Sequence, residues 1–257
     1  MKKIIVIILG SMLCISGCAN KNKPQQEKNL SAEEIFQDAS KHLKSQEYQK
    51  AADFFAKITQ EYPYSNLASK SHVMEAYSYY LKKDYDMTIA IAENFVKLYP
   101  VNPYTPYIYY LKALSYYEQI LDIDHDQKIT ELTKDAADEL ISRFPESDYA
   151  RDFKIKLDLI NDHLAGKEMI IGRFYLYKGE ILAAINRFNI VIKDYQTTAH
   201  IEEALFRLVE GYLKLGIKDE AQKYAQILGY NYPNSKWYDY AYEILIKAKA
   251  YAIKSSD

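Results

Sequence analysis

Residues 51–65 read Ala-Ala-Asp-Phe-Phe-Ala-Lys-Ile-Thr-Gln-Glu-Tyr-Pro-Tyr-Ser, and this stretch decides the fold. Proline lacks an N–H group and disfavours helix at the residue before it, so the Tyr-Pro pair is expected to end a helix. Ser65, two residues later, is of a type that caps the start of the next helix. The pair returns at spacings of 37, 45, 51 and 37 residues, as Tyr62-Pro63, Tyr99-Pro100, Phe144-Pro145, the variant Tyr195-Gln196 and Tyr232-Pro233.

Small residues recur at fixed places inside these units. They lie 24 or 12 residues before the proline position, at Ala39, Ala76, Gly172, Ala51, Ala184 and Ala221. Small side chains let two antiparallel helices approach closely, and the pattern resembles the tetratricopeptide repeat, a helix hairpin of about 34 residues. We therefore predict an all-α fold, a right-handed superhelical solenoid of about five tetratricopeptide-like hairpins with a C-terminal closing helix. The hairpins are expected at 32–63, 69–100, 106–145, 165–196 and 202–233, and the closing helix at 236–252.

Two units are longer than the others. The third has about eight extra residues around Asp122–Asp126, and the fourth has an extra stretch within 147–165 that itself has helical spacing. The three aspartates of 122–126 match the start of an EF-hand calcium loop. Gln127 then stands where that loop needs glycine, and Thr133 where it needs glutamate. The sequence predicts a solvated loop here and leaves open whether it binds an ion.

The first residues have the composition of an export signal. Two lysines precede the apolar segment 4–15, and the tetrapeptide Ile-Ser-Gly-Cys at 15–18 resembles the bacterial lipobox. We expect a lipoprotein signal peptide over 1–17, lipid on Cys18 and a flexible polar tether over 18–30. The alternative is ordinary signal cleavage that leaves Cys18 as a free thiol.

Charge and residue usage narrow the classes of function. The formal net charge is −2 with no basic block, which argues against nucleic-acid binding. Cys14 and Cys18 are the two cysteines, so leader removal and lipidation would leave no thiol for a disulfide, a nucleophile or a zinc site. No HExxH, Gly-rich phosphate loop or GxSxG motif is present. We expect no enzyme, metal or cofactor, although a catalytic site assembled from distant residues stays open.

Tyrosine is the outlier of the composition, with 26 residues. Neighbouring residues on a helix point about 100° apart, so Tyr79 and Tyr80, or Tyr109 and Tyr110, cannot share one direction. Some tyrosines must therefore face a groove or solvent. A rigid apolar ring with a hydroxyl group suits recognition of extended peptides that end in an aromatic residue.

The lipobox, the tether and five units of these lengths resemble the BamD family, lipoproteins of the outer-membrane β-barrel assembly machinery. The segments that carry the resemblance are 122–126, 143–150, 173–179 and 184–188. The resemblance implies a scaffold anchored by lipid to the periplasmic face of the outer membrane. Residues 31–120 would be the repeats that receive unfolded barrel precursors. Residues 121–257 would dock on the periplasmic domains of a BamA-like barrel-forming subunit, beside other assembly lipoproteins.

The same resemblance points to particular side chains. It implies a precursor-binding groove, for which we select Tyr48, Tyr77, Tyr80, Tyr107 and Tyr110. For docking on the partner we select Arg187, with Lys178 beside it where the family often has arginine. Arg187 can equally be an exposed helix residue with a local acidic partner.

Two other functions fit the sequence. One is another periplasmic tetratricopeptide lipoprotein, such as a pilotin or a cell-envelope coordinator, although pilotin repeats are typically regular. The other is an enzyme or enzyme adaptor in cell-wall metabolism, and the missing motifs argue against catalysis but not against an adaptor.

Overall fold

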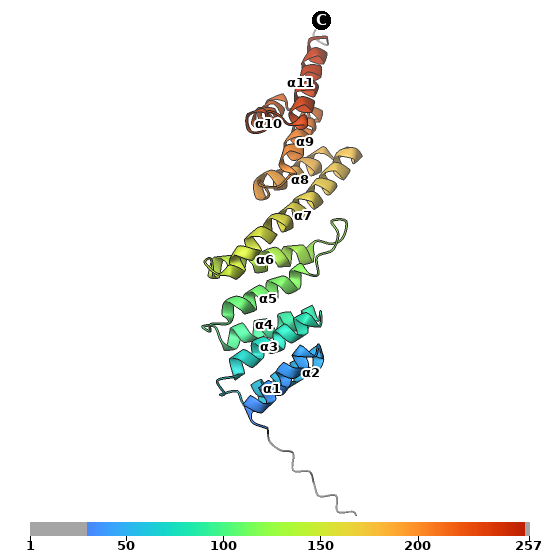
Figure 1. Cartoon of the computed structure of the whole chain (residues 1–257). Helices are drawn as coiled ribbons and strands as arrows, with labels where there is room; N and C mark the ends of the chain where they lie inside the picture. Colours follow the sequence, from blue (N-terminus) through green and yellow to red (C-terminus); the bar gives the residue numbers. More distant parts are fainter. Residues whose placement is uncertain (1–29, 255–257) are drawn as a thin grey trace, which may run out of the picture.

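The computed structural model describes residues 30–254, with side chains as far as residue 248. Within this range eleven helices and no strand follow one another in an elongated stack (Figure 1). The helices are α1 (Ala32–Lys44), α2 (Tyr48–Glu61), α3 (Ala68–Leu81), α4 (Tyr85–Leu98), α5 (Thr105–Tyr117), α6 (Lys128–Arg143), α7 (Asp148–Lys178), α8 (Ile181–Asp194), α9 (Ile201–Lys214), α10 (Lys218–Asn231) and α11 (Lys236–Lys254).

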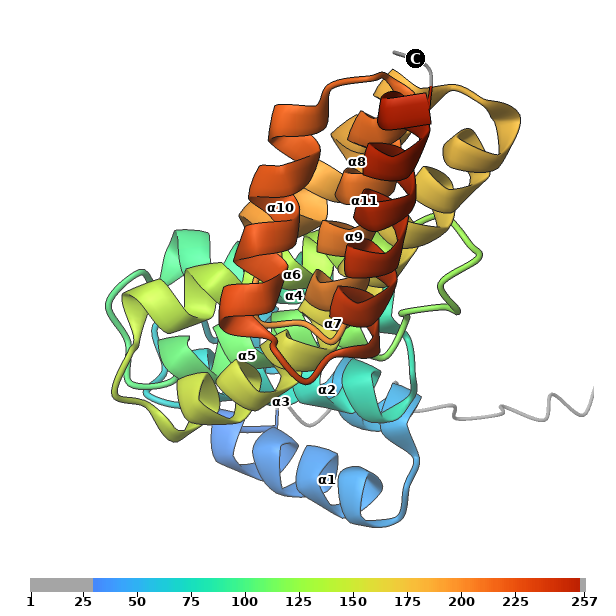
Figure 2. The same ribbon diagram turned by 90° about the horizontal axis from the view of Figure 1, so that it is seen from above.

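These helices form five hairpins and a closing helix, which confirms the predicted all-α solenoid. The pairs are α1 with α2, α3 with α4, α5 with α6, α7 with α8, and α9 with α10, and α11 packs on α9 and α10. Viewed along the stack, α10 and α11 run across the direction of α1 (Figure 2). The extra helical stretch of the fourth unit joins the first helix of its hairpin, so α7 is one helix of 31 residues.

The aromatic-proline pairs end helices as predicted. α2 and α4 end one residue before Tyr62 and Tyr99. α8 ends one residue before Tyr195, although glutamine follows there instead of proline. Ser147 caps α7 by accepting a hydrogen bond from the backbone N–H of Ala150 at 3.1 Å. The end of α8 therefore does not depend on a proline after the aromatic residue.

Buried rings and small residues pack between the helices of the stack. Phe55, Phe95, Phe153 and Phe188 are fully buried, and they lie on α2, α4, α7 and α8. Gly172 of α7 lies so close to Phe188 that a Cβ atom there would be 2.4 Å from the ring. The small residues of the repeat thus mark helix crossings, as the sequence predicted.

Tight turns join the two helices of four hairpins. Each turn contains one residue with positive φ, a conformation that costs most residues about 1 kcal/mol or more but glycine much less. Glycine takes this place at Gly179 and Gly216, whereas Gln46 and Lys83 take it in the first two hairpins.

The predicted signal peptide, Cys18 and nearly all of the tether lie outside the described residues. Leu30, the last residue assigned to the tether, is half-buried, and its backbone carbonyl accepts a hydrogen bond from the Tyr62 hydroxyl at 2.7 Å. Between residues 30 and 254 none of the helices has the length and apolar character that crossing a membrane requires.

Candidate protein-binding site

Five tyrosines from three helices form what we call the tyrosine cluster: Tyr77, Tyr80, Tyr107, Tyr110 and Tyr149. Tyr77 and Tyr80 lie on α3, Tyr107 and Tyr110 on α5, and Tyr149 at the start of α7. The ring centroid of Tyr107 lies 6.5 Å from Tyr77 and 5.5 Å from Tyr149. Tyr110 and Tyr149 are 5.0 Å apart. These spacings are typical of interacting aromatic rings, and Tyr80 packs on the same buried cluster as Tyr77 and Tyr107. The second, third and fourth hairpins therefore share one aromatic surface.

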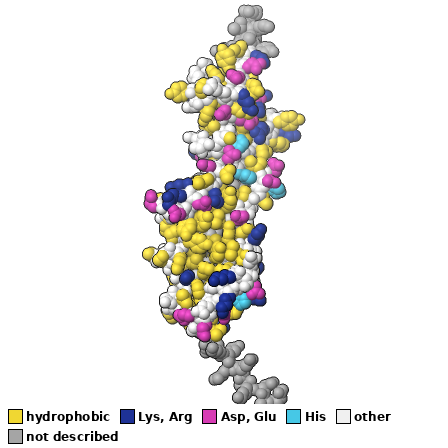
Figure 3. Space-filling model, in the orientation of Figure 1, with side chains coloured by type: hydrophobic (Ala, Val, Ile, Leu, Met, Phe, Trp, Pro, Cys, Tyr) yellow, Lys and Arg dark blue, Asp and Glu magenta, His cyan; other side chains and the backbone are white. Residues whose placement is uncertain are grey.

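The cluster belongs to a broader apolar region. Figure 3 shows hydrophobic side chains gathered over the part of the solenoid that contains α3 to α6. Tyr85 extends the aromatic surface next to Tyr80, with ring centroids 5.9 Å apart, and the buried Phe153 supports Tyr110 from below at 5.5 Å. Contiguous apolar surface of this kind is typical of protein-binding sites.

Carboxylates border the cluster and accept hydrogen bonds from it. The Tyr110 hydroxyl donates to Asp152 at 3.0 Å, and the Tyr80 hydroxyl donates to Glu118 at 3.5 Å. Burial, and then these carboxylates, raise the pKa of both Tyr80 and Tyr110 to about 12. Burial also raises the pKa of Tyr107. The hydroxyl groups therefore keep their protons at neutral pH and act as hydrogen-bond donors.

The structure brings together four of the five tyrosines selected from the sequence. Tyr48, the fifth, begins α2 and makes no ring contact with the cluster among the described residues. Tyr149 was missed, although it bridges Tyr107 and Tyr110. The signal for it was its place four residues before Phe153 in the helical stretch that lengthens the fourth unit. A helix that brings Phe153 into the core places Tyr149 on a neighbouring part of the same face.

Arg187 has an acidic partner within the chain. Its Nη1 atom lies 3.1 and 3.3 Å from the two carboxylate oxygens of Glu168, and Arg187 is on α8 while Glu168 is on α7. This is the local pairing that the sequence analysis left open as an alternative. The pair is only partly exposed, and Nη1 is the guanidinium nitrogen that contacts the Glu168 carboxylate. Its role in docking stays a prediction.

Lys178 lies in an exposed apolar surface, the α7–α8 tip, which we define as Phe174, Tyr177, Lys178 and Leu182. The Lys178 ammonium nitrogen lies 5.7 Å from the centre of the Phe174 ring. Phe174, Tyr177 and Leu182 are all exposed. In Figure 3 hydrophobic side chains stand beside basic ones where the end of α7 projects from the stack. Large apolar residues next to a cation, held on two helices, suit contact with another protein.

A lysine side chain from α7 binds the aspartate loop of the third unit. The ammonium group of Lys167 donates to the carbonyl oxygens of Asp124 and His125 at 3.0 and 3.2 Å. The Gln127 side chain donates to the His125 carbonyl at 2.9 Å. These contacts satisfy the backbone carbonyl oxygens of Asp124 and His125 within the chain. In the described part of the chain no three His, Cys, Asp or Glu side chains are placed to hold a metal ion.

Comparison with known proteins gives consistent matches over most of the chain. The family model described as YfiO, outer membrane lipoprotein, matches residues 28–228. The outer membrane protein assembly factor BamD of Rickettsia prowazekii is 46% identical over 95% of this chain and 96% of its own length. BamD of Caulobacter vibrioides is 42% identical over 90% of this chain and 76% of its own length. Among solved structures, the TPR2AB domain of yeast Sti1 has 13% identity and a TM-score of 0.43, covering 87% of this chain and 84% of that chain.

Proposed function

The chain belongs to the YfiO family of outer membrane lipoproteins, and from this premise we propose that it is a non-catalytic scaffold of outer membrane protein assembly. In this proposal lipid on Cys18 holds the solenoid at the periplasmic face of the outer membrane. The N-terminal hairpins together with the start of α7 bind unfolded barrel precursors, and the C-terminal hairpins dock on the periplasmic domains of a BamA-like barrel-forming subunit. Other assembly lipoproteins would share this complex. The names of the relatives, the half-buried tyrosine cluster and the exposed α7–α8 tip support this assignment.

The tyrosine cluster is the main structural observation that supports the proposal of precursor binding. Its rings offer apolar area at small cost in side-chain entropy, and its hydroxyl oxygens can accept hydrogen bonds from the N–H groups of a peptide backbone. The Nζ atom of Lys156 lies 2.8 Å from Oδ2 of Asp152 at the border of the cluster, where it offsets the negative charge of that carboxylate. An extended strand that ends in an aromatic residue and a carboxylate would place the ring on Tyr77 and Tyr107. Its carboxylate would then lie toward Lys156.

A labelled peptide tests this binding mode. We expect a ten-residue peptide of alternating polar and apolar residues that ends in phenylalanine to bind the chain. The same peptide ending in serine should bind about tenfold or more weakly, since one buried aromatic anchor contributes at least about 1.4 kcal/mol. The Tyr77→Ala/Tyr80→Ala double variant should lose the preference for phenylalanine in fluorescence anisotropy titrations.

Tyr64→Ala is the matched control, because Tyr64 is fully exposed and lies outside the cluster. Circular dichroism of each variant checks that the fold is kept. A double variant that is folded and still prefers the phenylalanine peptide would place the binding site elsewhere.

The α7–α8 tip and Arg187 support docking through the C-terminal hairpins. The tip offers exposed apolar area with a cation, and Arg187 offers a planar guanidinium group that Glu168 already contacts. A carboxylate of the partner can join this ion pair, since a guanidinium group has five N–H donors. Arg187→Lys would keep the positive charge but lose the planar set of N–H donors that can bind two carboxylates at once.

A further inference from the structure

The closing helix α11 leaves uncovered a face that is covered in the earlier hairpins. A shift of 37 residues aligns Thr198 with Ser235, the residues two positions after the proline position of their units. In the same alignment, Tyr242 and Ile246 of α11 correspond to Leu205 and Val209 of α9. Tyr242 is 59% exposed and Ile246 is 49% exposed, whereas Leu205 and Val209 are at most 1% exposed.

The same two positions are buried in the other first helices that align without a gap. Shifts of 133 and 170 residues give Tyr109 and Ala113 on α5 and His72 and Ala76 on α3. None of these four residues is more than 6% exposed. These two positions are therefore buried on α3, α5 and α9 but exposed on α11, at Tyr242 and Ile246.

In each earlier hairpin the covering element is the second helix. Leu205 and Val209 share a buried cluster with Ala221, Ala225 and Leu228 of α10. Tyr109 and Ala113 pack with Ala136, Ala137 and Leu140 of α6. His72 contacts Phe95 of α4, with ring centroids 5.7 Å apart. The face at 242 and 246 therefore matches the faces that receive a second helix in the earlier hairpins.

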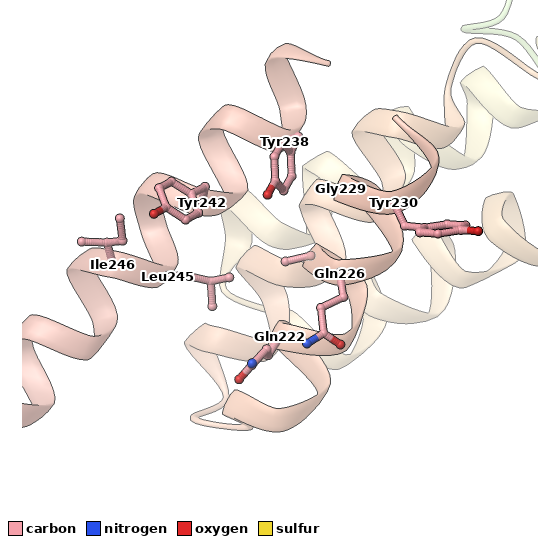
Figure 4. Close-up of a pocket in the computed structure, with 9 residues that line it drawn as sticks. Gln222, Gln226, Gly229, Tyr230, Tyr238, Tyr242, Leu245 and Ile246 are labelled. Carbon is pink, nitrogen blue, oxygen red and sulfur yellow. The ribbon is translucent and has the colours of Figure 1, made fainter. Parts of the chain in front are cut away.

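An apolar groove runs beside this face. It has a volume of about 520 Å³ and lies between α10 and α11 (Figure 4). The two helices touch at one end, where a Cβ atom on Gly229 would lie 2.5 Å from Tyr238. Leu245 points from α11 toward α10, and Gln222 and Gln226 lie on the α10 side. Among residues 30–248 no charged side chain lines the groove.

A helix that merely closed the solenoid would present polar residues to solvent at these positions, because terminal repeats need a polar outer face for solubility. We propose that the α10–α11 groove binds one amphipathic helix of a partner protein. In this complex the partner helix takes the place of the second helix of a sixth hairpin. Its buried face is apolar with neutral polar edges, since the groove offers amides and hydroxyls and no charge for an ion pair. This proposal is independent of the precursor-binding role of the tyrosine cluster.

The chain itself supplies a probe. α6 packs on Tyr109, which is the equivalent of Tyr242, so a fluorescein-labelled peptide with the sequence of residues 128–144 presents a suitable face. We expect saturable binding to the full chain in fluorescence anisotropy, with a gain of helical circular dichroism, because an isolated helix of this length is marginal in water. The peptide with Ala137→Asp and Leu140→Asp, whose apolar face is broken, should not bind.

Substitution in the groove locates the binding site. Ile246→Asp should weaken binding of the probe about tenfold or more, because it places a charge against an apolar face. Ile155→Asp, at an exposed isoleucine on α7, should leave the affinity unchanged.

Four results would overturn the proposal. They are no saturable binding, equal binding of the two peptides, equal effects of the two protein variants, and competition by the phenylalanine-ended extended peptide. Sedimentation of the free chain at several concentrations tests for self-association. A dimer that Ile246→Asp dissociates would also overturn the proposal, because a second copy of this chain would then occupy the groove.

Discussion

Replacing Ala184 by tryptophan is expected to lower the free energy of unfolding by about 3 kcal/mol, the upper end of the usual cost of overpacking a core. Ala184 is fully buried on α8, where it packs in one cluster with Ala165 and Met169 of α7 and Leu208 of α9. An indole ring would have to push three helices apart. Each hairpin of a solenoid buries its apolar face on its neighbours, so the loss should extend beyond one hairpin. Urea unfolding followed by circular dichroism measures it.

Leu182→Trp is the matched control, because Leu182 lies on the same helix with its side chain exposed. It should leave the unfolding midpoint within the small range of ordinary surface substitutions. An Ala184→Trp variant as stable as the unmodified chain would contradict the repeat register that places residue 184 at a helix crossing.

Replacing Glu75 by glutamine is expected to stabilise the chain, and to do so more strongly at higher pH. Burial on α3, and then the nearby carboxylate of Asp53, raise the pKa of Glu75 from 4.5 to about 7. The folded chain therefore binds a proton that the unfolded chain has lost, and its stability falls as the pH rises from 4.5 to 7. From this difference in pKa, glutamine should add about 1 kcal/mol at pH 5 and about 3 kcal/mol at pH 8.

Urea unfolding of both proteins at pH 5 and pH 8 checks the sign and the pH window. Glu61→Gln serves as control, since Glu61 is an exposed residue at the end of α2, and it should show no such pH dependence. A Glu75→Gln variant whose advantage is the same at both pH values would mean that Glu75 is ionised in the folded chain at pH 5.

The repeat was readable from the sequence because its signals are local. A Tyr-Pro pair ends a helix through backbone chemistry, and an alanine at a fixed distance from it permits close packing. The structure shows which part of this rule is dispensable, because α8 ends beside Tyr195 without a proline. The positive-φ turns were less readable, since Gln46 and Lys83 occupy a conformation that glycine usually takes.

The candidate sites depend on contacts between distant residues, and the sequence predicted them less completely. Tyr149 joins the tyrosine cluster only because α7 packs against α5, and Glu168 meets Arg187 only because α7 and α8 form a hairpin. The continuity of α7 was also not foreseen, because helical spacing on either side of residue 165 does not say whether two helices are joined. No local pattern fixes such pairings, so a single sequence gives candidates but not their partners.

Co-purification tests the scaffold role most directly. The full chain is extracted from outer membranes in mild detergent, and the proteins that accompany it are identified by mass spectrometry. We expect a β-barrel protein with tandem periplasmic domains in comparable amount. It should be lost with Arg187→Glu and kept with Arg151→Glu. Arg151 is the control because it is an exposed arginine that, like Arg187, has an acidic partner within the chain, Asp148. A secretin, a murein enzyme or no partner in place of the barrel protein would contradict the assembly role.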